Sequence, residues 1–242
     1  MRRALLIVVG LLFAVPQHAR AVESLPNLVP RAPFNLVVAQ ADGSASQKAI
    51  RLSTTTENIG AGHLELLGIP PLGLDETAAM QCVEWDNRVC QRRDQVGTFE
   101  FHAEHQHWHF NDYARYDLRA LLPNGLPDMT EAGLLRSGGK ISFCLLDTER
   151  SEKRDPEPDD PFGDAGFYHG CTGLIQGISR GWADTYGSYL VGQQIVLDGL
   201  ANGRYALMIT VNPLKILRES SYTDNVSHAV IDLNGDDVRV VG

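Results

Sequence analysis

The chain has 242 residues and a formal net charge of −9 at pH 7, from 21 basic and 30 acidic side chains. This acidic balance argues against nucleic acid and anionic membranes as partners, because both attract basic surfaces. It is compatible with cationic partners such as amines, and equally with a charge that only keeps the protein in solution. The length suits one domain with a sizeable hydrophobic core.

Residues 1–21 have the form of a secretory signal peptide. Two arginines precede an apolar run from Ala4 to Val15, and Ala19-Arg20-Ala21 has the small-x-small form of a cleavage site. The run is shorter than the roughly 20 residues that a membrane-spanning helix needs. Cleavage there removes three arginines and no acid, which moves the formal charge to −12. We therefore expect a secreted or periplasmic protein, soluble after cleavage, with one domain at residues 22–242.

Most of the remaining chain predicts short strands separated by Gly, Pro, Asn and Asp, a spacing typical of a β-sandwich. The expected strands are residues 34–40, 49–60, 63–69, 98–110, 114–122, 141–147, 193–200, 204–212 and 228–233. One helix of one or two turns is expected at residues 129–137, and a polar, Pro-rich exposed loop at residues 149–166. The predicted fold class is mainly β: a single-domain β-sandwich with long loops and little helix.

The four cysteines predict two disulfides, because an even number in an exported chain indicates oxidised pairs. Three pairings are open. Cys82 and Cys90 flank a short segment with a turn signal at Asp86-Asn87, so this pair would close a local loop. The preferred pairing is therefore Cys82–Cys90 with Cys144–Cys171. Thiolate metal ligands are the alternative, but the spacings match no common zinc pattern.

Three histidines, His105, His107 and His109, occupy every second position of one predicted strand. Alternate residues of a strand face the same side, so the three imidazoles would stand in a row with Trp108 pointing away. Such a row can hold one metal ion and leave coordination positions open for oxygen or substrate. The strict alternation favours a metal site over a solvated face that is rich in His by chance. His102 is out of phase with the row, and the spacing alone leaves copper, zinc and iron open.

Five ordered blocks of the sequence carry a resemblance to a known family. They are LPNLVP (25–30), HQHWHFNDYARYDL (105–118), GKISFCLLDT (139–148), CTGLIQGISRGWADTYG (171–187) and VNPLKILRESSYTDN (211–225). Each is similar to a block of the lysyl oxidase catalytic domain, and together they span nearly all of the mature chain. Ordered matches are more specific than one motif. On this resemblance the chain is identified as a bacterial-type secreted member of the lysyl oxidase family.

The resemblance implies a copper-dependent oxidoreductase that oxidises primary amines to aldehydes, with molecular oxygen as the acceptor. It implies that copper is held by His105, His107 and His109. It also implies that Tyr222, in the block ESSYTDN, is the tyrosine that is converted into a quinone cofactor. The substrate would be a small amine or a protein lysine.

The chain departs from the family pattern at the lysine that is cross-linked to the quinone. The family has this lysine before Pro-Gly-x-Tyr, whereas this chain reads Ala201-Asn202-Gly203-Arg204-Tyr205. Ala201 therefore stands at the lysine position, and a methyl group cannot add to a quinone. Leu174 likewise stands where the family pattern has a histidine.

Three hypotheses follow for the cofactor. Tyr222 forms a quinone without a cross-link, or another lysine reaches it, with Lys215 seven residues away and Lys140 before a predicted strand as candidates. In the third hypothesis no quinone forms, and the chain is a non-catalytic secreted copper-binding protein. The general base stays open among three acids of the matched blocks, each of which could instead orient a histidine or cap a turn: Asp112, Asp184 and Glu219.

Overall fold

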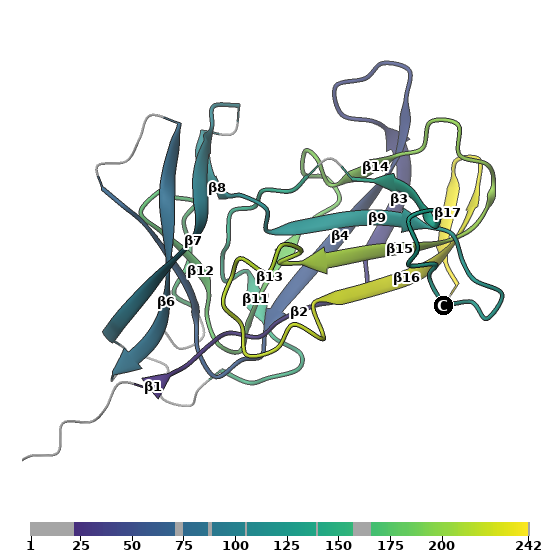
Figure 1. Ribbon diagram of the computed structural model, residues 1–242. Helices are drawn as coiled ribbons and strands as arrows, with labels where there is room; N and C mark the ends of the chain where they lie inside the picture. The colour runs from purple at the N-terminus through teal and green to yellow at the C-terminus, as the bar shows by residue number, and fades with distance from the viewer. Residues whose placement is uncertain are drawn as a thin grey trace, which may run out of the picture.

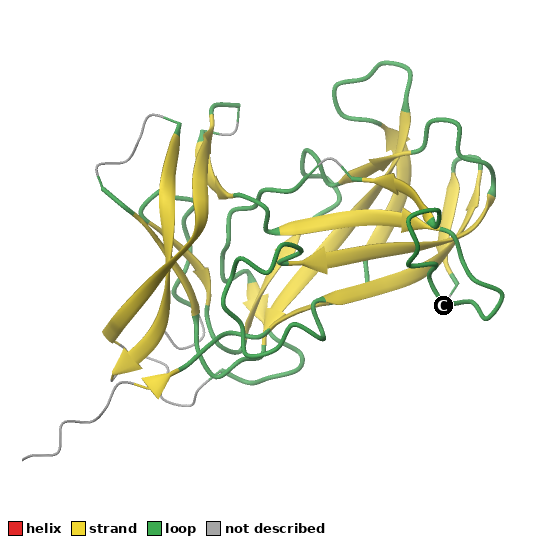
Figure 2. Ribbon diagram, in the orientation of Figure 1, coloured by secondary structure: helices red, strands yellow, loops and turns green. Residues whose placement is uncertain are grey.

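The computed structural model describes residues 22–70, 75–86, 89–104, 106–138, 140–156 and 166–241. The predicted signal peptide at residues 1–21 and the histidine at position 105 lie outside these ranges, as do residues 157–165 of the predicted loop. The described residues contain no helix, and their strands pair antiparallel in three sheets (Figure 2). The predicted mainly β fold class is confirmed. Because the described part has no helix, it also has none that could cross a membrane.

One sheet has the strand order β12-β5-β6-β7-β8, with β1 paired to β6, and lies on the left of Figure 1. Its strands are β1 (Val22–Glu23), β5 (Leu64–Gly68), β6 (Glu76–Asp86), β7 (Val89–His102), β8 (His107–Phe110) and β12 (Ile175–Ile178). The long hairpin β6–β7 forms most of this sheet. The short strand β8 pairs with the last residues of β7 at the edge of the sheet.

The two other sheets lie together on the right of Figure 1. One has the order β10-β9-β15-β16-β17, with β9 (Ala114–Arg119), β10 (Leu134–Ser137), β15 (Gly203–Val211), β16 (Val226–Asn234) and β17 (Asp237–Val240). The other is built on β4 (Lys48–Asn58), which pairs with β2 (Leu28–Pro30), β3 (Phe34–Gln40), β13 (Trp182–Tyr186) and β14 (Gln194–Val196), while β11 (Glu149–Arg150) pairs with β13. Strand β2 contacts β15 and β16, and β3 contacts β17, so these two sheets pack on each other.

Strand β4 lies at the centre of its sheet because its residues suit a buried strand. Ile50 and Leu52 are fully buried, and the run Thr54–Thr56 supplies β-branched residues, which favour extended backbone. Buried hydroxyls need partners. The hydroxyl of Thr54 lies 3.0 Å from that of Tyr116 on β9, and the hydroxyl of Thr55 lies 2.6 Å from that of Thr185 on β13.

Three local predictions are wrong. Residues 129–137 form a turn followed by β10 instead of a helix, because the side chain of Asp128 accepts the N–H of Thr130 and residues 134–137 pair with β9. Residues 98–110 form two strands instead of one, since the N–H of Gln106 bonds the carbonyl of His102 and the chain reverses there. Residues 141–147 form an isolated bridge between Phe143 and Phe110 instead of a strand.

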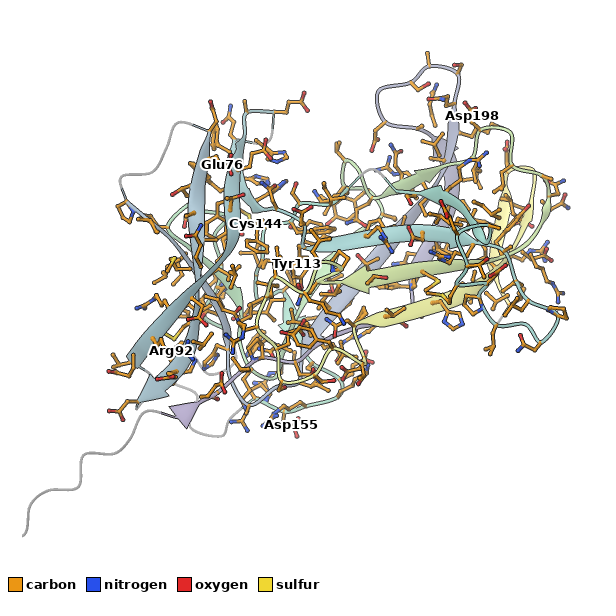
Figure 3. All side chains as sticks on the ribbon, viewed as in Figure 1. Glu76, Arg92, Tyr113, Cys144, Asp155 and Asp198 are labelled. Atoms are coloured by element: carbon orange, nitrogen blue, oxygen red, sulfur yellow. A yellow bond between two sulfur atoms is a disulfide. The ribbon has the colours of Figure 1, made fainter. Side chains whose placement is uncertain are left out.

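The predicted disulfide pairing is confirmed. Cys82–Cys90 joins β6 to β7 near the end of their hairpin, with Cα atoms 5.8 Å apart. Cys144–Cys171 joins two loop segments that are 27 residues apart in the sequence, with Cα atoms 5.3 Å apart. In the view of Figure 3, Cys144 lies between the sheet that contains β8 and the strand β9.

The carboxylate of Glu57 joins β4 to the segment that follows β11. Its side chain is fully buried, and one oxygen accepts hydrogen bonds from the Ser151 hydroxyl and the Glu152 N–H, both at 2.7 Å. The guanidinium of Arg31 lies 3.3 Å from the same oxygen. Burial alone would raise the pKa of Glu57, but the hydrogen bonds from Ser151 and Arg31 outweigh it and hold the pKa below its ordinary value.

We expect this carboxylate to make folding stability depend on acid pH. A folded pKa below the unfolded one stabilises the protein at neutral pH, and that contribution is lost as the pH falls through the folded pKa. Glu57→Gln should therefore lower the free energy of unfolding at pH 7 by about 1–3 kcal/mol, with a smaller difference from the wild type at pH 3. Urea unfolding at both pH values measures this, with the exposed Glu131→Gln as the matched control. An equal loss at both pH values would contradict the ionised state of Glu57.

Candidate metal centre

Two of the three predicted histidines lie together on β8. His107 and His109 are alternate residues of this strand, and their Nε2 atoms are 2.8 Å apart. His109 is buried and His107 is half-buried. The Nε2 separation fits a hydrogen bond between neutral imidazoles. It also equals the separation of two nitrogens that bind one ion at about 2.0 Å and at right angles. Imidazole nitrogens suit copper and zinc, so the described donors fit such an ion.

His102 belongs to the same cluster, although the sequence pattern placed it out of phase. The turn between β7 and β8 brings His102 opposite His107 in the antiparallel pair. Its ring centroid is 4.2 Å from that of His109, and the Ser142 hydroxyl lies 3.4 Å from a ring nitrogen of each. The prediction missed this because it assumed one continuous strand. The sequence between His102 and His107 contains no Gly, Pro or Asn that would have signalled a reversal.

Strand β8 is held on both of its edges. On one edge it pairs with β7. On the other, Phe110 exchanges two backbone hydrogen bonds with Phe143, and the Trp108 N–H bonds the carbonyl of Cys171 at 3.0 Å. The side-chain amide of Gln176 also donates to the Trp108 carbonyl at 2.8 Å. The two segments on this outer edge are themselves joined by the Cys144–Cys171 disulfide, which fixes the orientation of both histidines.

A pocket of about 480 Å³ opens beside His107 and His109. Its lining is mostly apolar and combines residues from β8, β13 and the loops at residues 140–148 and 187–193. The other lining residues are Lys140, Cys144, Leu146, Thr148, Cys171, Asp184, Thr185, Tyr186, Tyr189, Leu190 and Val191. This volume has room for a small organic molecule next to the imidazoles.

Asp184 and Lys140 are two of the pocket residues whose pKa values are strongly shifted. Asp184 on β13 is 3% exposed, and burial raises the pKa of its carboxyl well above the ordinary value. One oxygen accepts the Leu146 N–H at 3.4 Å, while the other has no hydrogen-bond partner. Burial also lowers the pKa of Lys140 to about 8, although the nearby charge of Asp184 opposes this shift. Burial thus favours the uncharged form of both groups.

Tyr222 does not line this pocket. Its hydroxyl accepts the Glu219 N–H at 3.3 Å and donates to the Leu217 carbonyl at 3.2 Å. The amine of Lys215 lies 5.7 Å from the centroid of the Tyr222 ring. The structure therefore separates the two candidate lysines: Lys215 lies beside Tyr222, whereas Lys140 lies in the histidine pocket.

The three candidate general bases lie at different places in the structure. Asp184 lines the pocket, and Asp112 and Glu219 do not. Asp112 has a φ of 55° and occupies the turn that follows β8. Glu219 is buried and accepts three N–H groups at 2.7 Å, from Leu28, Asn212 and Asn225. Burial still raises the pKa of Glu219 to about 7. Its contacts make it a structural link between β2, β15 and β16.

The two departures from the family pattern lie at exposed positions. Ala201 is exposed before β15, and its carbonyl accepts the Tyr205 hydroxyl at 2.6 Å. Leu174 is 50% exposed before β12. Neither side chain lines the histidine pocket. The structure thus offers no substitute for the missing lysine at Ala201 itself.

Comparison with known proteins gives one family. The lysyl oxidase family model matches residues 28–242. Protein-lysine 6-oxidase of Homo sapiens is 33% identical over 141 residues, which are 57% of this chain and 29% of the relative. The Gallus gallus enzyme of that name is 31% identical over 170 residues, 63% of this chain and 36% of the relative. Lysyl oxidase homolog 1 of Homo sapiens is 33% identical over 139 residues, 57% and 21% of the two chains. The matched part thus spans about a third or less of each relative.

Proposed function

Because this chain belongs to the lysyl oxidase family, we propose that it is a copper-dependent oxidoreductase that converts primary amines to aldehydes. The observation that carries the proposal is the pair of imidazoles on β8, which face a pocket large enough for a small amine or a lysine side chain. When bound, copper and a tyrosine-derived quinone supply the oxidation of the amine and the reduction of molecular oxygen. This chain's own residues bind, orient and exchange protons.

We assign the copper to His105, His107 and His109. The described pair supports this assignment through its nitrogen separation of 2.8 Å and through the clamped strand that carries it. His102 and Ser142 lie behind His109 and would fix the plane of its ring, as residues around metal ligands commonly do. Copper would thus sit at the end of the pocket that β8 forms.

We assign Tyr222 as the quinone precursor and Lys215 as the amine that replaces the lysine missing at Ala201. The 5.7 Å between the Lys215 amine and the Tyr222 ring supports this pair, because rotation of the four-carbon side chain covers such a gap. Lys215 is exposed, so its amine is free to move. Lys140 is less suited to this role, since its amine lies against the rings of Phe143 and Tyr186.

A second function follows from two observations. Ala201 removes the usual cross-link, and Tyr222 does not line the histidine pocket. A chain with the histidines and without a working quinone would be a secreted copper-binding protein. The predicted signal peptide and two disulfides fit an oxidising compartment under either function.

The copper assignment predicts the effect of removing the described ligands. Residues 22–242 should bind one copper per chain, and His107→Ala combined with His109→Ala should weaken binding on the order of 100-fold or more, since both ring nitrogens are lost. Copper content after gel filtration and the Cu(II) electron paramagnetic resonance spectrum measure this. The matched control is His228→Ala, on β16. Retention of one tightly bound copper by the double variant would contradict the site.

The cofactor assignment predicts a specific chemical label. After copper loading in air, phenylhydrazine should label the peptide that contains Tyr222, and Tyr222→Phe should remove the label. Lys215→Arg should keep a label but abolish the cross-linked peptide mass, while Tyr205→Phe should change neither. A label without a cross-link in the wild type would indicate a free quinone. No label on protein with one tightly bound copper would favour the copper-binding function.

A further inference from the structure

Lys140 places an amine inside the histidine pocket without an ionic partner. The residue is only 9% exposed, and its amine lies 5.2 Å from the ring centroid of Phe143 and 5.4 Å from that of Tyr186. Across the ranges that the structure describes, no residue forms a hydrogen bond or an ion pair with this amine. Burial makes such a lysine costly to keep charged, and the contacts with the two rings offset only part of that cost.

The acid that lines this pocket, Asp184, is also almost fully buried, and one of its oxygens has no hydrogen-bond partner. Other titratable groups that line the pocket are Tyr186 on the same strand, Tyr189 in the loop after it, and His107 and His109 on β8. Burial lowers the pKa of Lys140 to about 8 and raises that of Asp184 well above its usual range. Burial thus raises the neutral share of the amine and the protonated share of the carboxyl.

We propose that Lys140 is a covalent binding site for small aldehydes, with Asp184 as the proton donor for the condensation. Neutral, desolvated lysines are the nucleophiles that form Schiff bases with carbonyl compounds. The pocket of about 480 Å³ leaves room for a short carbon chain, and Leu146, Leu190 and Val191 offer it apolar walls.

The condensation balances without an oxidant or a reductant. The lone pair of the Lys140 Nζ bonds the carbonyl carbon, and the carbon–oxygen π pair moves onto oxygen. One proton of the nitrogen passes to this oxygen, which gives a carbinolamine. The Asp184 carboxyl then gives its proton to the hydroxyl, which leaves as water while the nitrogen lone pair forms the carbon–nitrogen double bond. The second proton of the nitrogen returns to the Asp184 carboxylate and leaves the neutral imine. The unpartnered oxygen of Asp184 is available for this exchange.

This site needs neither copper nor a quinone, so it goes beyond the proposed amine oxidation. Its link to that activity rests on the proposed function, because aldehydes are the products of amine oxidation. An aldehyde released at the proposed Tyr222 quinone would reach Lys140 by diffusing into the histidine pocket. Lys140 would then retain the product there until water hydrolyses the imine.

The test uses the metal-free folded chain, so that it does not depend on the oxidase activity. The protein is incubated with butanal and sodium cyanoborohydride at pH 7, and the alkylated peptides are mapped by mass spectrometry. Lys140 should be alkylated at least tenfold faster than the exposed Lys48 and Lys215, since burial lowers the pKa of Lys140 to about 8 and leaves roughly a tenth of its amine neutral at that pH. The preference should vanish in urea. Faster alkylation of the exposed lysines, or no alkylation of Lys140, would overturn the proposal.

Variants test the nucleophile Lys140 and the proton donor Asp184 separately. Lys140→Arg keeps a cation and should lose the adduct at this peptide, while Lys48→Arg should leave it unchanged. Asp184→Asn keeps the shape but removes the proton donor, and should slow the alkylation of Lys140 at least tenfold. Circular dichroism of each variant confirms that it is folded. An unchanged rate in folded Asp184→Asn would overturn the role of Asp184, and an adduct count unchanged in Lys140→Arg would overturn the site.

Discussion

The clamping of β8 is the constraint on which the candidate site depends. A strand of four residues is too short to hold its position through one neighbour, and its side chains would then point in variable directions. Here β7 bonds one edge, and the segments at Phe143 and Cys171 bond the other. Both imidazoles therefore project from a backbone with partners on each side. Preorganised ligands of this kind bind a metal without a further ordering cost.

The pocket beside this strand has an unusual electrostatic character. Its walls are mostly apolar, and its lysine and aspartic acid both lie in surroundings that favour their neutral forms. A carboxyl and an amine that formed an ion pair would cancel each other and leave no reactive group. Keeping them apart preserves one proton donor and one nucleophile in the same small volume. The two proposed reactive sites, one at Lys140 and one around Tyr222 and Lys215, thus lie at different places in the fold.

The sequence predicted the parts of the fold that local patterns determine. Alternating apolar residues located β3, β4, β15 and β16, and the local spacing of Cys82 and Cys90 indicated their disulfide. Apart from residues 98–102, the hairpin β6–β7 was not predicted, because half-buried charges such as Glu84 and Arg92, which pair across the strands, interrupt the alternation of apolar residues in the sequence. The reversal between β7 and β8 was missed because the sequence there has no Gly, Pro or Asn to signal a turn. Proximities such as that of Lys140 and Asp184, 44 positions apart, arise only from tertiary folding.

The Cys144–Cys171 disulfide also makes the structure around the candidate site depend on the oxidation of these two cysteines. It joins the two segments that hydrogen-bond the outer edge of β8. Before the disulfide forms, with both cysteines reduced, only noncovalent contacts would link these segments. Newly made chain in a reducing compartment would carry every histidine and still lack the covalent frame around them. Oxidation of this pair completes the frame around the candidate site, which happens only where thiols are oxidised. Under the proposed copper assignment, copper in the compartment of synthesis would meet a site without its covalent frame.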